Sequence, residues 1–179
     1  MLDDLNQNVI KALFSYDPEE GLLRWRNPAG VYGRISAGSI AGSTTNKEGY
    51  RYVSINGKLY RGSRLIWVYM TGEWPKVQVD HKDRDTGNDK WDNLRLATGS
   101  QNTANKGKQK SKKREPTSML KGVQAVQKAK GIRYRAIATK DGVREHLGYF
   151  DTEELAHAAY LKRSKELHGE FASDGKPPD

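Results

Sequence analysis

The stretch from Val79 to Asn105, which reads VDHKDRDTGNDKWDNLRLATGSQNTAN, decides the fold of the middle of the chain. A short apolar approach at residues 77–79 leads into Asp80 and His81, and a polar loop too hydrophilic to be core follows. Residues 94–97 read LRLA, an alternation typical of a strand. Residues 98–101 read TGSQ, and this Thr-x-x-Gln capping box predicts the start of a helix. The predicted order is strand, loop, strand, helix, with polar residues where the elements converge.

The polar residues of this stretch suit metal-assisted chemistry. Asp80 and the amide of Asn102 offer hard oxygen ligands, and two such ligands leave most positions of an ion such as Mg²⁺ to water and substrate. The imidazole of His81 could then take a proton from water beside a metal-bound phosphate. Asn93 could hold either the imidazole or the loop by hydrogen bonding. Taken singly, these side chains also fit a loop carboxylate, a partly buried histidine and a solvated amide.

The combination D-H-x(11)-N-x(8)-N, with NLRLAT in its middle, resembles the ββα-metal motif of HNH endonucleases in the branch of phage and intron homing enzymes. The resemblance implies that Asp80 and Asn102 bind one divalent metal, Mg²⁺ or else Mn²⁺. It implies that His81 is the general base and that Asn93 supports the site. Further similar segments (GYRYV at 49–53, KLY at 58–60, RLIW at 64–67, TGEWP at 71–75) extend the resemblance to residues 14–107.

One residue departs from this family. Many members have His-Arg-Leu where this chain reads Ser63-Arg64-Leu65. Ser63 can bond a phosphate or cap a helix, but it cannot carry a proton charge near neutral pH. If the histidine of the family contributes to the reaction, Ser63 at its place in the site implies a slow or inactive enzyme.

The composition limits the possible partners. Lys and Arg number 31 against 22 Asp and Glu, a net charge of +9, which favours nucleic acid or an anionic membrane surface. No run of about eighteen apolar residues is present, so we expect no membrane span. The chain begins MLDD, without the basic and apolar pattern of a signal peptide. It has no cysteine, which excludes disulfides and zinc-thiolate sites, and we expect an intracellular protein.

The segment before the motif predicts short elements. We expect an amphipathic helix over residues 2–14, a turn at 17–21 and a strand at 22–26. Strands at 50–55 and 58–61 should flank a tight turn at Asn56-Gly57, and a helix should cover 63–71. The apolar positions expected to face inward are Leu2, Leu5, Val9, Ala12 and Leu13 in the first helix and Leu65, Ile66 and Tyr69 in the second.

Residues 106–118 read KGKQKSKKREPTS, with no apolar residue and a dense basic run. Such a run is typical of a solvated linker. Beside a nuclease motif we interpret it as a linker that also follows phosphates, which would steepen the salt dependence of binding. It would add affinity but would not read base sequence.

The C-terminal part predicts three strands, at 122–127, 132–139 and 143–150, and a helix from Thr152 to about residue 168 with Asp151 or Thr152 as its cap. Because successive side chains of a strand point to opposite faces, we expect Tyr134, Ala136 and Ala138 to pack against the helix. The helix stripe is expected to comprise Leu155, Ala156, Ala159, Tyr160 and Leu167. His157 and His168 are expected to lie away from the sheet and to be structural. The other sheet face should be basic and open, wide enough for the DNA major groove.

This part resembles the Apetala/ethylene-response-factor DNA-binding domain through KGVQ at 121–124, YRA at 134–136 and HLGYFDTEELAHAAY at 146–160. The resemblance implies that the sheet reads the major groove. Plant members have more arginine and tryptophan at several contact positions, which leaves the target sequence open. The contacting residues implied by position are Lys121, Gln124, Lys128, Arg133, Arg135, Thr139, Arg144 and His146.

The prediction is therefore an α+β protein: an HNH domain at 1–107 with its ββα-metal core at about 77–107, a linker at 108–118, a three-stranded antiparallel sheet packed on one helix at 119–173, and a tail. Its expected function is metal-dependent cleavage of duplex DNA as a monomer, without a membrane or protein partner. The alternative is a DNA-binding protein with an impaired nuclease domain. RNA binding is a weaker alternative because the sheet lacks an aromatic stacking pair.

Overall fold

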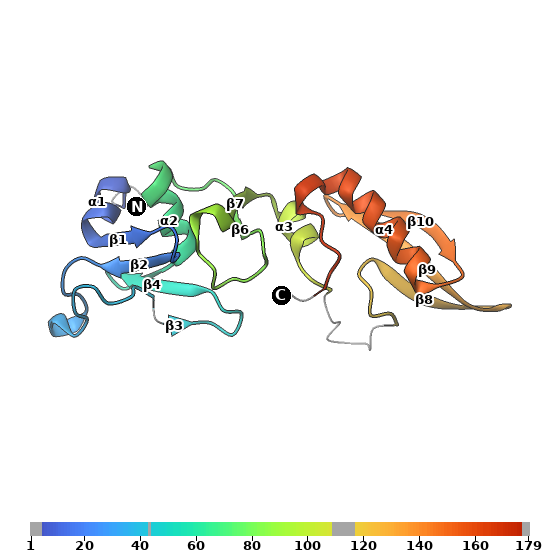
Figure 1. Ribbon diagram of the computed structural model, residues 1–179, viewed down its shortest axis with the longest axis horizontal. Helices are drawn as coiled ribbons and strands as arrows, with labels where there is room; N and C mark the ends of the chain where they lie inside the picture. The colour runs from blue at the N-terminus through green and yellow to red at the C-terminus, as the bar shows by residue number, and fades with distance from the viewer. Residues whose placement is uncertain (1–4, 43, 109–116, 177–179) are drawn as a thin grey trace. The chain divides into compact units, whose positions relative to one another are not determined.

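A computed structural model describes residues 5–42, 44–108 and 117–176 of the chain. The chain forms two compact units, residues 1–96 and residues 97–179, and most of their helices and strands are labelled in Figure 1. The helix that follows the capping box, which the sequence predicts as part of the nuclease domain, falls into the second unit. Among the described residues, no helix combines the length and the apolar character needed to cross a membrane.

The first unit is built from two helices and small sheets. Its order is α1 (Gln7–Leu13), β1 (Phe14–Asp17), β2 (Leu22–Trp25), the 3-10 helix η1 (Val31–Gly33), β3 (Thr44–Thr45), β4 (Arg51–Ile55), β5 (Lys58–Arg61), α2 (Gly62–Thr71), β6 (Gln78–His81), the 3-10 helix η2 (Trp91–Asn93) and β7 (Leu94–Ala97). Strands β1 and β2 pair antiparallel, β3, β4 and β5 form a three-stranded sheet, and β6 pairs with β7.

The core of the first unit forms where α1 and α2 meet the strands. Ile10, Phe14, Leu65 and Ile66 are 0–1% exposed, and the ring of Phe14 packs on Trp25 at 4.5 Å between centroids. Burying side chains of this size contributes about 1.5–3 kcal/mol each relative to leaving them in water. The buried face of α2 thereby fixes the strand β6 that follows it.

Several local predictions for this unit are confirmed. Asn56 and Gly57 have positive φ values of 49° and 77° and join β4 to β5, as a tight hairpin turn requires. Helix α2 begins one residue before the predicted start, and Leu65 and Ile66 face the core. Of the two roles open to Ser63, capping this helix is not the one adopted: the N-cap is Arg61, which makes no side-chain cap bond.

The register predicted for the first helix is wrong. Asn6 accepts a bond from the amide of Val9 and so starts the helix at Gln7, while residues 1–4 lie outside the described part. Phe14 leaves the helix to begin β1, a strand that the sequence did not predict. In the short helix that remains, Ile10 is buried, whereas Val9 is 36% exposed and Ala12 is exposed. Leu5 and Leu13 of the predicted stripe do pack, partly buried, against the core.

The second unit places a sheet against a helix. Its order is α3 (Gly99–Asn105), β8 (Val123–Lys128), β9 (Gly131–Lys140), β10 (Val143–Phe150), α4 (Glu153–His168) and the 3-10 helix η3 (Gly169–Phe171). The strands pair antiparallel in the order β10-β9-β8. Helix α4 lies along the sheet (Figure 1), and Ala136, Ala138 and Ala156 at their contact are 0–1% exposed. These small side chains let the helix approach the strands closely.

The cap predictions for this unit are confirmed. Thr98 and Gln101 form both bonds of the capping box at the start of α3. Thr152, not Asp151, caps α4 by accepting from the amide of Leu155.

Two details of α4 correct the sequence analysis. Leu155 is 55% exposed and does not belong to the buried stripe. His168 faces the sheet and is 9% exposed, because its Nε2 bonds the carbonyl of Thr139 at 2.9 Å. The polar side chain of His168 is therefore part of the contact between α4 and β9.

Candidate active site

Asp80 and His81 are the last two residues of β6, and both side chains are buried, at 5% and 3% exposure. The neighbouring strand β7 supplies Arg95, whose Nε donates to Oδ2 of Asp80 at 3.0 Å. The side chains of Arg95 and Asp80 are only 10% and 6% exposed, so this ion pair is buried. A buried carboxylate needs such a partner because an isolated ion in the interior is strongly destabilising.

His81 is held by a residue that the sequence analysis did not single out. Its Nε2 lies 2.9 Å from Oδ1 of Asp89, which is 2% exposed. A carboxylate can only accept a hydrogen bond, so Nε2 carries the hydrogen and Nδ1 becomes the basic nitrogen of the ring. This arrangement has the histidine and the orienting carboxylate of a general-base pair.

Besides His81, two further elements hold Asp89. The hydroxyl of Tyr16 donates to the carbonyl of Asp89 at 2.8 Å. A Cβ added to Gly62, at the start of α2, would lie 3.2 Å from Oδ2 of Asp89, so this carboxylate oxygen packs against the start of the helix. The partial positive charge of a helix N-terminus favours a carboxylate at this place. The loop that was predicted to be too hydrophilic for the core therefore contributes one fully buried side chain.

The rest of the loop is braced by Asn93. Its Nδ2 donates to Oδ1 of Asp83 at 2.9 Å and to the carbonyl of Asn88 at 2.7 Å. Its Oδ1 accepts from the amide of Asp83 at 3.0 Å, and its carbonyl accepts from the amide of Lys82 at 2.9 Å. Asn93 thus ties the two ends of the loop together, which fixes the segment that carries Asp89.

Two tyrosines border the pair. The ring of Tyr50 lies 6.0 Å from the His81 ring, and the guanidinium of Arg61 lies over Tyr50 at 4.2 Å. Burial raises the pKa of Tyr50, although Arg61 works in the opposite direction. Burial, and then the charge of Asp89, raise the pKa of Tyr16 far above its ordinary value. Both phenols therefore stay neutral at physiological pH, and His81 is the side chain here suited to accept a proton.

Comparison with known proteins agrees with this geometry. A family model described as HNH endonuclease matches residues 60–104, the range that holds Asp80, His81 and Asp89. The chain is 34% identical over 108 residues to Protein 3.8 of Escherichia phage T7, which covers 60% of the chain and 84% of that relative. The chain therefore carries an HNH endonuclease domain at residues 60–104.

Another relative of this HNH protein bears the family name. An uncharacterized HNH endonuclease of Acanthamoeba polyphaga mimivirus is 32% identical over 131 residues. The match covers 73% of the HNH chain and 64% of that relative, so the chain spans less than two thirds of the viral protein. No solved structure matches significantly. The family match ends at residue 104, and the Apetala resemblance of the C-terminal part stays a prediction.

HNH nucleases generally use a divalent metal, and the donors in this chain fit an ion that keeps most of its water. Asp80 offers a buried carboxylate, and the neighbouring Arg95 limits how much positive charge the site can gather. Across residues 5–42, 44–108 and 117–176, no three His, Cys, Asp or Glu side chains cluster as a metal site. This donor set suits Mg²⁺ or Mn²⁺ better than a closed zinc centre. The second predicted ligand, Asn102, lies on α3 in the second unit.

The predicted DNA-contacting residues lie on one face of the second unit, with one exception. Cross-strand pairs place Gln124 opposite Arg135, Arg144 opposite Thr139 and His146 opposite Ile137. Residues directly opposite each other in a sheet share a face. We call this surface the open face: Gln124, Val126, Lys128, Arg133, Arg135, Ile137, Thr139, Arg144, His146 and Tyr149.

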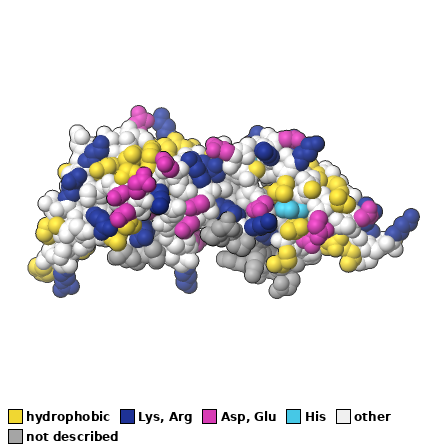
Figure 2. All heavy atoms as spheres, in the orientation of Figure 1, with side chains coloured by type: hydrophobic (Ala, Val, Ile, Leu, Met, Phe, Trp, Pro, Cys, Tyr) yellow, Lys and Arg dark blue, Asp and Glu magenta, His cyan; other side chains and the backbone are white. Residues whose placement is uncertain are grey.

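The exception is Lys121, which precedes the strands and contacts α3 instead. Some members of the open face are also engaged within the protein. Arg135 donates to Gln124 at 2.5 Å, and Arg133 pairs with Asp151 at 2.9 Å. On the face of the molecule drawn in Figure 2, basic side chains are scattered among acidic ones and do not gather into one patch.

Asp89 and Arg95 are the site residues that sequence reasoning missed. The pattern around Asp89, a polar loop with several acidic residues, gives no sign of which one is buried. Arg95 lies between two leucines in a strand, yet Leu96 is 39% exposed and Arg95 is buried. The need for a cationic partner follows from the burial of Asp80, which the sequence analysis did not predict.

Proposed function

We propose that this HNH protein is a metal-dependent endonuclease of the homing type that hydrolyses phosphodiester bonds in duplex DNA. The observation that carries the proposal is the buried His81, which stands beside Asp80 at the end of β6 and whose Nε2 is bonded to Asp89. Together with the family match, this pair supplies a base in a fixed orientation. A merely structural HNH scaffold would not need the second buried carboxylate.

His81 accepts a proton at Nδ1 from the attacking water. The water oxygen forms a bond to phosphorus as the bond from phosphorus to the leaving sugar oxygen breaks. Asp89 keeps the ring in the tautomer with hydrogen on Nε2, and its charge favours the imidazolium that forms. Asp80 and Asn102 would hold the divalent ion, Mg²⁺ first and Mn²⁺ as the substitute. When bound, the ion stabilises negative charge on the phosphate and on the leaving oxygen.

The C-terminal sheet is proposed to hold the DNA in the manner of Apetala-type domains. The ten residues of the open face include four cations and no carboxylate. Glu145, the acidic residue of β10, lies on the opposite face and bonds Arg163 of α4 at 2.8 Å. This separation of charge favours a polyanion on the open face. Most of the basic run at 106–118 lies outside the described residues, and its role along phosphates stays a prediction.

The second candidate is a DNA-binding protein that has lost catalysis. Ser63 favours it, because this side chain is 3% exposed at the second residue of α2, where many family members have histidine. A buried hydroxyl cannot replace an imidazole that gains or loses a proton near neutral pH. The presence of Asp80, His81, Asn93 and Asn102 at all four positions of the motif favours the proposed nuclease activity.

Supercoiled plasmid with Mg²⁺ or Mn²⁺ separates the two functions when the chain is compared with its Ser63→His variant. We expect nicked product from the chain itself, because one site per monomer cuts one strand at a time. Product from Ser63→His alone would show that the fold is intact but a working side chain is missing. If neither protein nicks the plasmid while duplex binding is retained, the result would establish the binding-only function and refute the proposed nuclease activity.

A further inference from the structure

The helix that carries Asn102 is fastened at its carboxyl end by Lys121. The Nζ of Lys121 donates to the carbonyl of Ala104 at 2.5 Å and to the carbonyl of Lys106 at 2.6 Å. The last carbonyls of a helix have no partner within the helix, and a cation placed there also meets the negative end of the helix dipole. Lys121 thus supplies both the hydrogen bonds and the charge that the end of α3 lacks.

Lys121 is itself held in place by other elements of the second unit. Its carbonyl is bonded by Nδ1 of His157 on α4 at 2.9 Å. The next carbonyl, that of Gly122, accepts from the amide of Ile137 on β9 at 2.8 Å. Gly122 has a φ of +76°, and a Cβ there would lie 2.1 Å from the ring of Tyr160, so only glycine fits. The lysine therefore extends from a backbone whose path is fixed by both α4 and β9.

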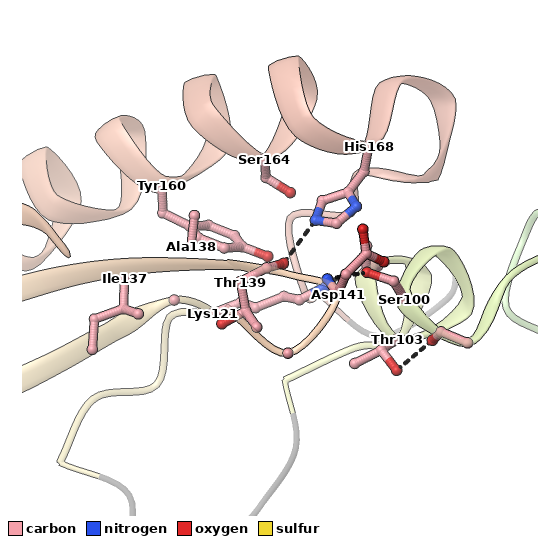
Figure 3. A pocket seen from close by; sticks show the side chains of 14 residues that line it. Ser100, Thr103, Lys121, Ile137, Ala138, Thr139, Asp141, Tyr160, Ser164 and His168 are labelled. Carbon is pink, nitrogen blue, oxygen red and sulfur yellow. Dashed lines mark hydrogen bonds between the residues drawn. The ribbon is translucent and has the colours of Figure 1, made fainter. Parts of the chain in front are cut away.

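Two further contacts fasten α3 to the same unit. Near its start, the hydroxyl of Ser100 accepts from the amide of Asp141 in the turn between β9 and β10, at 2.9 Å (Figure 3). Just past its end, Nζ of Lys108 donates to the carbonyls of Leu120 and Val123 at 3.0 and 3.4 Å. Lys108 is half-buried, and this burial lowers its pKa.

Asn102 lies between these fastening points. A cavity of about 550 Å³ separates part of α3 from β9 and α4, and Lys121, Ser100 and Thr103 are among its lining residues (Figure 3). Ala104 and Asn105, at the end of α3, are buried at 8% and 5% exposure, while the first turns border the cavity, so the hydrogen bonds at the two ends of α3 help to fix its position. Removing one of these hydrogen bonds should let the helix shift.

We infer that Lys121 is a positioning residue for α3 and, through α3, for Asn102, and that Lys121 does not contact DNA. The inference rests on the proposed role of Asn102 as a metal ligand. It reverses the role that the Apetala resemblance implies for Lys121. Lys128 provides the contrast, because it is exposed on the open face with its Nζ 4.3 Å from the centre of the Tyr149 ring.

The test compares Lys121→Met with Lys128→Met in the full chain, since both substitutions remove one charge and keep a long side chain. Mn²⁺ binding is measured by calorimetry, and duplex affinity by fluorescence anisotropy. We expect Lys121→Met to weaken Mn²⁺ binding about tenfold, the usual lower bound for residues that orient a ligand, with duplex affinity changed less than about twofold. Lys128→Met should weaken duplex binding and leave Mn²⁺ binding unchanged, and Lys121→Arg should restore Mn²⁺ affinity.

The inference is overturned if Lys121→Met weakens duplex binding as Lys128→Met does while Mn²⁺ binding is unchanged. Absence of Mn²⁺ binding by the unchanged chain would refute the proposed metal site and not the fastening of α3. If the unchanged chain binds no Mn²⁺, or if Lys121→Met does not fold, the inference is tested by NMR on the lysine ammonium signals of the unchanged chain. A Lys121 signal that stays in place when duplex is added supports the inference, and one that shifts together with that of Lys128 overturns it.

Discussion

The first unit and the second unit use charged side chains in opposite ways. Beside β6, the pairs Asp80–Arg95 and His81–Asp89 are almost completely buried, with side chains 3–10% exposed. On the open face, Lys128, Arg144 and His146 are exposed to solvent. A buried charged side chain needs a partner held in one fixed geometry, whereas water stabilises an exposed charged side chain in many conformations. This difference fits the proposed roles, with chemistry at a fixed point for the first group and attraction along a polyanion for the second.

The largest expected effect comes from breaking a buried pair. Arg95→Met leaves the Asp80 carboxylate without its guanidinium and should lower the free energy of unfolding by about 3–5 kcal/mol. Urea unfolding measures this change. Arg24→Met is the matched control in the same unit, because Arg24 forms an ion pair with Glu20 in which the two side chains are 38% and 51% exposed. Loss of this exposed pair should lower the free energy of unfolding by less than about 1 kcal/mol. Equal losses of stability in the two variants would refute the contrast between buried and exposed charge.

The next effect concerns the orientation of the base. Asp89→Asn keeps the shape of the side chain but offers an N–H group to His81, which favours the tautomer with hydrogen on Nδ1. We expect the nicking rate to fall about a hundredfold or more, with duplex affinity unchanged. The ¹⁵N chemical shifts of the imidazole report the tautomer directly. A variant that loses activity while His81 keeps its tautomer would contradict this role for Asp89.

A smaller effect is expected on the open face. Arg144→Met removes an exposed cation, and if that cation neutralises one phosphate, the slope of log affinity against log salt concentration should fall by about 0.9. Anisotropy titrations at several salt concentrations measure the slope. Lys162→Met, which removes an exposed cation from α4, is the control and should leave the slope as it is. An equal change in both variants would mean that DNA does not select the open face.

The smallest effect is a pH dependence in the second unit. The carboxylate of Glu153 accepts bonds from the Ser118 hydroxyl and from the amides of Leu120 and Met119, and these bonds lower its pKa. Since the folded pKa lies below the unfolded one, Glu153 stabilises the fold above its ordinary pKa and loses this contribution as the pH falls through the folded value. Glu153→Gln should therefore lower the melting temperature at pH 7, and the difference should disappear in acid.

The exposed neighbour of this carboxylate is the control for the pH effect. Glu154→Gln removes the same charge from the first turn of α4, where the side chain is exposed. It should show little pH-dependent difference from the unchanged chain. A difference for Glu153→Gln that persists at low pH would show that packing, and not the charge of Glu153, stabilises this region.

The sequence predicted the features that depend on neighbouring residues. The capping box at Thr98 and Gln101, the turn at Asn56-Gly57 and the three strands of the second unit each follow from a few adjacent side chains. In contrast, the choice of Ile10 over Val9 as the buried residue of α1 depends on where Phe14 leaves the helix. Such a choice is made by packing against distant elements, which a local pattern does not contain.

The candidate site shows the same division. Asp80 and His81 stand out because adjacent residues place them at the end of a strand. Asp89 becomes a site residue only through Tyr16, Gly62 and His81, which are far from it along the chain or across the loop. Likewise, Lys121 looks like any exposed lysine until the carbonyls of α3 are placed beside it. The sequence alone therefore did not predict which residues form ion pairs or hydrogen bonds with the buried or positioned charged side chains.

The most direct test of the central claim is the nicking of supercoiled plasmid by the chain and by His81→Ala, with Mn²⁺ present. Lys162→Met is the control, because Lys162 is an exposed side chain of α4 with no part in the proposed chemistry. The proposed role of His81 as the base predicts nicking by the chain and by Lys162→Met, and a loss of about 10²–10⁴-fold for His81→Ala. Equal nicking by the chain and by His81→Ala would contradict that role.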